Sequence, residues 1–88
     1  MKRFDILNEH FPDCSLTIGR LLQDDLAFRE LCEDYEDATI ALNFWQASPE
    51  GSEQRVSGYR DLVVELEAEI AATLRKEELQ QRTRLNFV

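Results

Sequence analysis

The chain has 88 residues, of which 18 are acidic and 10 are basic, and its formal net charge is −8. A chain of this length forms one domain, and such small domains commonly need disulfides, a metal or further copies of themselves for stability. The negative charge repels phosphate backbones, and no apolar run is long enough to span a bilayer. We therefore expect a single soluble domain over residues 1–88 with neither a nucleic-acid nor a membrane partner.

The cysteine content and the first residues indicate the compartment. Cys14 and Cys32 are the only thiols in the sequence. Two cysteines do not make the disulfide framework of a small secreted domain. The first residues are basic, but no apolar segment of the kind found in signal peptides follows them. We expect a reduced, cytoplasmic protein.

The first half of the chain is predicted to contain an arm and a helical region. Residues 1–12 carry apolar side chains without a lasting helical period, which predicts an arm that packs on the rest of the chain. Pro12 suits the first turn of a helix, where its missing N–H has no partner in any case. The helical region is expected over 13–47, with Asp24 and Asp25 as candidate N-caps of its longer second part. Periodicity leaves open whether this region is one bent helix or two.

The second half is predicted to be a turn followed by one long helix. Ser48 and Pro49 are a helix-start signal, and residues 48–52 are expected to form the turn. The long helix should cover 53–82, and residues 83–88 should fray because the apolar period fades there. The predicted fold is therefore all-α: an antiparallel helical hairpin with a short N-terminal helix and an arm, assembling into a helical bundle.

Apolar stripes on the two long helices predict the seam of the hairpin. In each helix the apolar residues recur at alternating steps of three and four, which places them on one side. With the turn centred near residue 49, facing residues have numbers that sum to about 98, so Ala38 meets Tyr59. The expected seam residues are Phe28, Leu31, Tyr35, Leu42, Trp45, Val56, Tyr59, Val63, Leu66 and Ile70.

A second apolar face lies on the first long helix. Ile40, Phe44 and Ala47 are spaced i, i+4 and i+7, and Leu26 continues the row. Apolar stripes on two sides of a helix imply burial on both sides. The residues alone leave open whether the N-terminal arm, a second copy or another protein covers these four, which are the candidate self-association or partner surface. Self-association into a dimer or tetramer is the leading expectation.

Sites for chemistry have weak support in this sequence. The acids from Glu33 to Asp37 point in different directions around a helix, so they do not converge on a cation. His10 and Cys14 form at most half of a zinc site. The motifs of nucleophilic catalysis and phosphate binding are missing from the sequence. We expect no cofactor, no metal and no enzymatic activity.

The alternative to a self-associating scaffold is a regulatory adaptor whose acidic helix face binds a basic protein.

One combination of residues resembles a known family. It comprises Phe11-Pro12 followed by an acid, the step from Asp25 to Phe28, Tyr35 among acids, and Glu69-Ile70 in a long amphipathic helix. This pattern resembles the YdcH-type family of small bacterial helical hairpins. The resemblance implies a helical-hairpin fold in a short cytoplasmic protein of unknown function, and it supplies no active-site residues.

Overall fold

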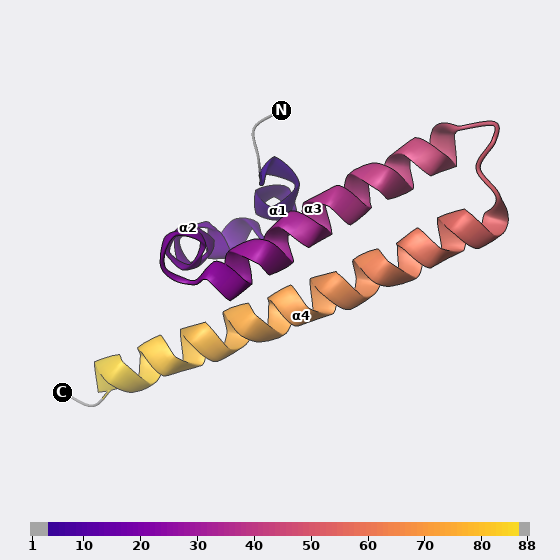
Figure 1. Ribbon diagram of the computed structural model, residues 1–88. Coiled ribbons are helices and arrows are strands. Elements are labelled where there is room, and N and C mark those ends of the chain that lie inside the picture. The colour runs from indigo at the N-terminus through magenta and orange to yellow at the C-terminus, as the bar shows by residue number, and fades with distance from the viewer. Residues whose placement is uncertain (1–3, 87–88) are drawn as a thin grey trace.

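The computed structural model describes residues 4–86, and side chains over residues 4–83, as an all-α protein (Figure 1). The elements are α1 (Asp5–His10), the 3₁₀ turn η1 (Pro12–Cys14), α2 (Ser15–Asp24), α3 (Leu26–Ala47) and α4 (Glu53–Asn86). Helices α3 and α4 lie antiparallel and form a long hairpin, while α1 and α2 pack at one end of it. The predicted all-α hairpin is confirmed.

The region before the turn consists of two helices separated by one extended residue. Asp25 has φ −129° and ψ 103°, which interrupts the helical path between α2 and α3. Its carboxylate accepts a hydrogen bond from the backbone N–H of Phe28, at 3.1 Å. Asp25 is therefore the N-cap of α3, and this bond favours the start of a new helix over one bent helix.

The N-terminal segment differs from the expected arm because residues Asp5–His10 form helix α1. Phe4 precedes the helix with φ 73°, in the left-handed region. Six residues are too few to show a helical period, which is why the sequence pattern did not reveal this helix. Phe4 and Leu7 are buried in the core, and α1 packs on α3.

The connection and the last helix complete the hairpin. Helix α3 ends at Ala47 and α4 begins at Glu53, so residues 48–52 connect them. The backbone N–H of Arg55 donates to Ser52 Oγ at 3.1 Å, which caps the start of α4. Helix α4 continues to Asn86, beyond the expected end at residue 82. The rest of the predicted frayed tail, residues 87–88, lies outside the described residues.

The hydrophobic core lies at the end of the hairpin where all four helices meet. Ile70 and Leu74 of α4 are buried there against side chains from α1, α2 and α3. Three of the predicted seam residues, Phe28, Tyr35 and Ile70, belong to this buried cluster, and Leu31, Val63 and Leu66 pack against it while partly exposed. The other core residues are Phe4, Leu7, Ile18, Leu21, Cys32 and Leu74.

Candidate interaction surface

Among the described elements, no third layer of helix covers the half of the hairpin next to the connection. We call residues 39–69 the distal hairpin. Helices α1 and α2 lie at the opposite end (Figure 1), and none of residues 39–69, all of which the structure describes, is buried. Its larger apolar side chains are nevertheless numerous: Ile40, Leu42, Phe44, Trp45, Val56, Tyr59, Leu62, Val63, Val64 and Leu66. Two helices can cover only one side of each other, so much of this apolar surface stays in contact with water.

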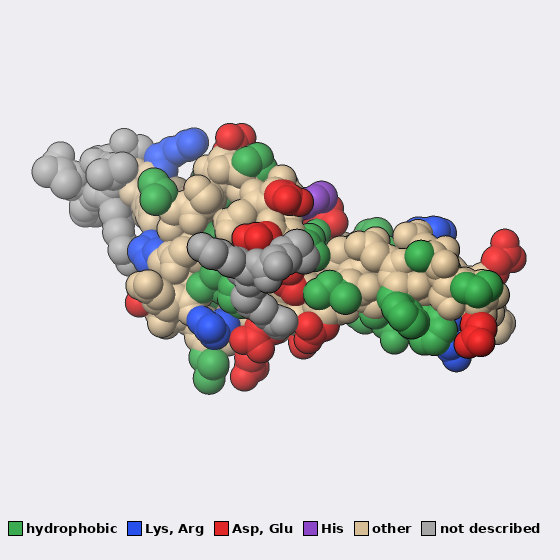
Figure 2. All heavy atoms as spheres, turned by 90° about the horizontal axis from the view of Figure 1, so that it is seen from above, with side chains coloured by type: hydrophobic (Ala, Val, Ile, Leu, Met, Phe, Trp, Pro, Cys, Tyr) green, Lys and Arg blue, Asp and Glu red, His purple; other side chains and the backbone are tan. Residues whose placement is uncertain are grey.

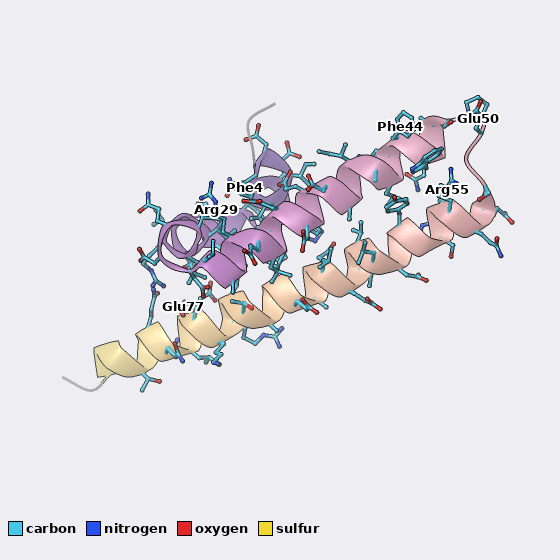
Figure 3. All side chains as sticks on the ribbon, viewed as in Figure 1. Phe4, Arg29, Phe44, Glu50, Arg55 and Glu77 are labelled. Atoms are coloured by element: carbon cyan, nitrogen blue, oxygen red, sulfur yellow. The ribbon has the colours of Figure 1, made fainter. Side chains whose placement is uncertain are left out.

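The predicted outer face of α3 is exposed. Ile40 is 50% exposed and Phe44 is 62% exposed, and Phe44 points away from α4 (Figure 3). Ala47 is exposed as well. Green apolar side chains gather on the narrow part of the molecule, away from the end where all the helices meet (Figure 2). These three residues form one continuous surface on the distal hairpin.

The fourth member of the predicted set lies elsewhere. Leu26 is 70% exposed, but it is the first residue of α3, about 21 Å along the helix axis from Ile40 at 1.5 Å per residue. The structure therefore brings together Ile40, Phe44 and Ala47 and separates Leu26 from them.

The described part of the N-terminal segment, residues 4–12, does not cover this surface. The backbone N–H of Leu7 in α1 bonds to Glu36 of α3, at 2.9 Å, and Phe4 and Leu7 pack in the core beside Cys32. Ile40, one turn after Glu36, remains half exposed. Of the three covers that the sequence left open, the arm is therefore excluded over its described residues, 4–12.

The tip of the hairpin is held by contacts across the connection. The guanidinium of Arg55 in α4 lies over the ring of Trp45 in α3, 4.2 Å from its centroid. The Phe44 ring meets the Trp45 ring edge to face, with centroids 5.0 Å apart. Gly51 lies so close to the carbonyl of Trp45 that a Cβ there would clash with it. These contacts fix the orientation of the distal aromatic residues although none of them is buried.

A shallow groove runs between α3 and α4 on one flank of the distal hairpin. Ala38 of α3 and Tyr59 of α4 both line it, in keeping with the expected register, and Asp34 and Asp37 stand at its edge. Its other lining residues are Ala41, Leu62 and Leu66. Leu62 was not among the predicted surface residues, and neither was Val64, although both are exposed. Both residues are apolar and lie outside the seam stripe of α4, and this position is the sequence signal that indicates their exposure.

The groups capable of chemistry have separate structural roles. His10 Nε2 lies 2.5 Å from Glu67 Oε1, and the Tyr35 hydroxyl donates to Glu67 Oε2 at 3.5 Å. Burial and then the negative charge of Glu67 raise the pKa of Tyr35 to about 12. Glu67 therefore has partners within the chain.

The two cysteines are held as neutral thiols. The Cys14 thiol donates to Glu78 at 3.2 Å, and this bond, followed by burial, raises the pKa of Cys14. Burial, reinforced by Glu36, raises the pKa of Cys32 to about 12. A thiol is a far weaker nucleophile and metal ligand than a thiolate. His10 and Cys14, the possible half of a zinc site, thus have different carboxylate partners, and no group of potential metal ligands occurs among the described residues.

Comparisons with protein-family models, with curated proteins and with solved structures found no match to this chain. The resemblance to the YdcH-type hairpins stays a prediction from the residues. Within the part of the chain that the structure describes, no helix has the length and apolar character needed to cross a bilayer.

Proposed function

We propose that this protein is a small non-catalytic scaffold that assembles with copies of itself through the distal hairpin. The observation that carries the proposal is the complete lack of buried residues over 39–69, in a segment rich in large apolar side chains. Burial of one such side chain contributes about 1.5–3 kcal/mol. Association that covers several of them therefore supplies stability that the small core of one chain lacks.

A second hairpin is a suitable cover for the first. Helical hairpins commonly pack in pairs as four-helix bundles, in which each hairpin buries the apolar side that its partner leaves open. The outer surface of α3 formed by Ile40, Phe44 and Ala47 has the i, i+4, i+7 spacing that such packing uses. The tip contacts of Trp45 hold this surface in a fixed shape before association, which lowers the entropic cost of binding.

The chemistry of the side chains supports a non-catalytic role in a reducing compartment, for which we propose the cytoplasm. Cys14 and Cys32 are both free, and their raised pKa values favour the unreactive thiol. His10 is paired with Glu67 instead of lying beside a nucleophile. The resemblance to small bacterial hairpins agrees with this role.

The second candidate is a monomeric adaptor for a basic protein. It is favoured by Asp34 and Asp37, which stand at the edge of the apolar groove beside Ala38 and Tyr59. Acidic groups around an apolar groove suit a partner helix that has basic residues beside its apolar stripe.

Sedimentation equilibrium of two matched variants tests the proposed scaffold. Phe44→Glu places a charge in the distal surface, whereas Leu16→Glu makes the same kind of change at a residue of α2 that is 90% exposed and lies outside it. We expect the wild type and Leu16→Glu to sediment above the 10.3 kDa of one chain, and Phe44→Glu to have a lower average mass with unchanged helical circular dichroism. A wild type that stays at the mass of one chain at all concentrations contradicts the scaffold and favours the adaptor.

A further inference from the structure

The side of α4 opposite its buried residues Ile70 and Leu74 carries a regular stripe of exposed residues, one of which, Leu62, also borders the groove between α3 and α4. Figure 1 shows no other described element on this side of α4, whereas Ile70 and Leu74 face the core. From Gly58 to Thr83 the stripe advances at alternating steps of four and three, and all its members are exposed. This is the heptad spacing with which one helix packs along another. The stripe is therefore suited to a straight helix as its partner.

Charge is segregated along this stripe. The acids Glu65 and Glu69 belong to its first half, with Asp61 beside it, and Lys76 belongs to its second half, with Arg75 beside it. The ion pairs found among the described side chains involve other residues, so these five charges have no opposite partner in that part of the chain. Acids four apart on a helix repel one another. A partner that brings basic side chains to the first half would remove this repulsion.

The stripe is complementary to the same stripe of a second copy when the two α4 helices run antiparallel. In an antiparallel pair of α4 helices whose facing residue numbers sum to about 141, Leu62 meets Leu79 and Glu65 meets Lys76. In the same register Gly58 meets Thr83, so small residues face each other at both ends. Glu69 meets Ala72, and the neighbouring Arg75 lies within reach of Glu69. A parallel pair would instead place Glu65 against Glu65 and Lys76 against Lys76.

The surface shape agrees with this register. One shallow groove on the second half of the stripe is lined by residues that include Ala72, Leu79 and Thr83. Another groove, on the first half, is lined by residues that include Gly58 and Leu62. The antiparallel register places Leu79 of one copy over the groove at Leu62 of the other copy, and the reverse.

We infer that a second copy of this chain docks antiparallel along the outward face of α4, with Glu65 of each copy against Lys76 of the other. This inference rests on the proposed self-association and gives it a geometry. The twofold axis passes near residues 70 and 71. Phe44 points away from α4 (Figure 3), so the α4 face and the surface around Phe44 can bind other copies at the same time.

Charge reversal in the full-length chain tests the inference. Glu65→Lys and Lys76→Glu each create two like-charge contacts in the antiparallel pair, so each variant alone should associate at least about tenfold more weakly than the wild type. The double variant exchanges the two charges and should associate like the wild type. An equimolar mixture of the two single variants should also recover association, because every contact between them is again between opposite charges. Sedimentation equilibrium measures all four samples, and circular dichroism checks that each remains helical.

Matched controls separate this contact from net charge. Arg82→Glu makes the same charge change as Lys76→Glu at an exposed residue of α4 outside both the stripe and the distal hairpin, and Glu30→Lys matches Glu65→Lys at an exposed residue of α3 outside the distal hairpin. Both controls should associate like the wild type. If Lys76→Glu associates as strongly as Arg82→Glu, or if the mixture of single variants fails to recover association, the α4 geometry is wrong. The scaffold proposal survives that result when Phe44→Glu still lowers the mass, and both ideas fail if the wild type is a monomer.

Discussion

The carboxylate of Glu36 in α3 accepts a hydrogen bond from the backbone N–H of Leu7 in α1, at 2.9 Å, although 29 residues separate them in the sequence. Glu36 is only 2% exposed. Leu7 lies in the first turn of α1, where N–H groups have no acceptor within the helix and a negative charge is favourable. Glu36 thus replaces the missing side-chain cap of α1 and fixes that short helix to the hairpin.

We predict that Glu36→Ala destabilises the fold, because the buried N–H of Leu7 loses its acceptor. The expected loss in the free energy of unfolding is about 1–3 kcal/mol. Glu30→Ala, a change at an exposed residue of the same helix, is the control. Urea unfolding followed by circular dichroism measures both. Equal stability of the two variants would show that the bond to Leu7 contributes little.

Ile70→Ala should be the most damaging truncation in α4, because Ile70 is fully buried among residues of the other helices. The removed methyl groups and the cavity left behind cost about 2–5 kcal/mol. Leu16→Ala, at the exposed surface of α2, should change stability by less than about 0.5 kcal/mol. Thermal unfolding compares the pair. A similar melting temperature for both would place the core elsewhere.

Two glycines should respond in opposite ways to alanine. At Gly51 a Cβ would press on the Trp45 carbonyl, so Gly51→Ala should distort the connection and destabilise the hairpin by about 1–3 kcal/mol. At Gly19, in α2, a Cβ meets nothing, so Gly19→Ala should stabilise that helix by about 0.5–1 kcal/mol. Chemical denaturation measures the change in the free energy of unfolding for both variants. Stabilisation by Gly51→Ala would refute the close approach at the connection.

Stability should fall in alkaline solution. Burial raises the pKa of Cys32 from 9.0 to about 12. As the pH rises from about 9 towards about 12, the unfolded chain releases this proton while the folded chain keeps it, so ionisation favours unfolding. The raised pKa of Tyr35 acts in the same direction. The free energy of unfolding of Cys32→Ala should therefore decline less steeply with pH than that of the wild type.

The control for the pH experiment is Leu21→Ala, which also truncates a buried side chain but removes no titratable group. The free energy of unfolding of Leu21→Ala should decline with pH as steeply as that of the wild type. If the free energy of unfolding of Cys32→Ala also declines with pH as steeply as that of the wild type, the buried thiol is not responsible for the loss of stability in alkaline solution.

The hairpin was predictable because its information is local and repeated. Apolar residues such as Phe28 and Ile70 recur over several turns, and Ser48-Pro49 marks the interruption between the helices. The break at Asp25 was not decided by periodicity, since it depends on one side chain that accepts from Phe28. Helix α1 was missed because it is short and its cap, Glu36, lies far away in the sequence.

The candidate surface was predicted only in part, for a related reason. The spacing of Ile40 and Phe44 identified an apolar face, but the sequence could not say where α1 would end relative to it. Leu26 shares that face on a helical projection, and only the length of α3 shows that it lies too far away to join the other residues. The sequence does not single out Glu67, because its contacts with His10 and Tyr35 depend on tertiary packing.

Amide hydrogen exchange at two protein concentrations tests the central claim most directly. If other copies cover the distal hairpin, protection of residues 39–69 rises with concentration, while protection around Ile18 and Cys32, which are already buried within one chain, stays the same. Exchange over 39–69 that is independent of concentration would contradict the account.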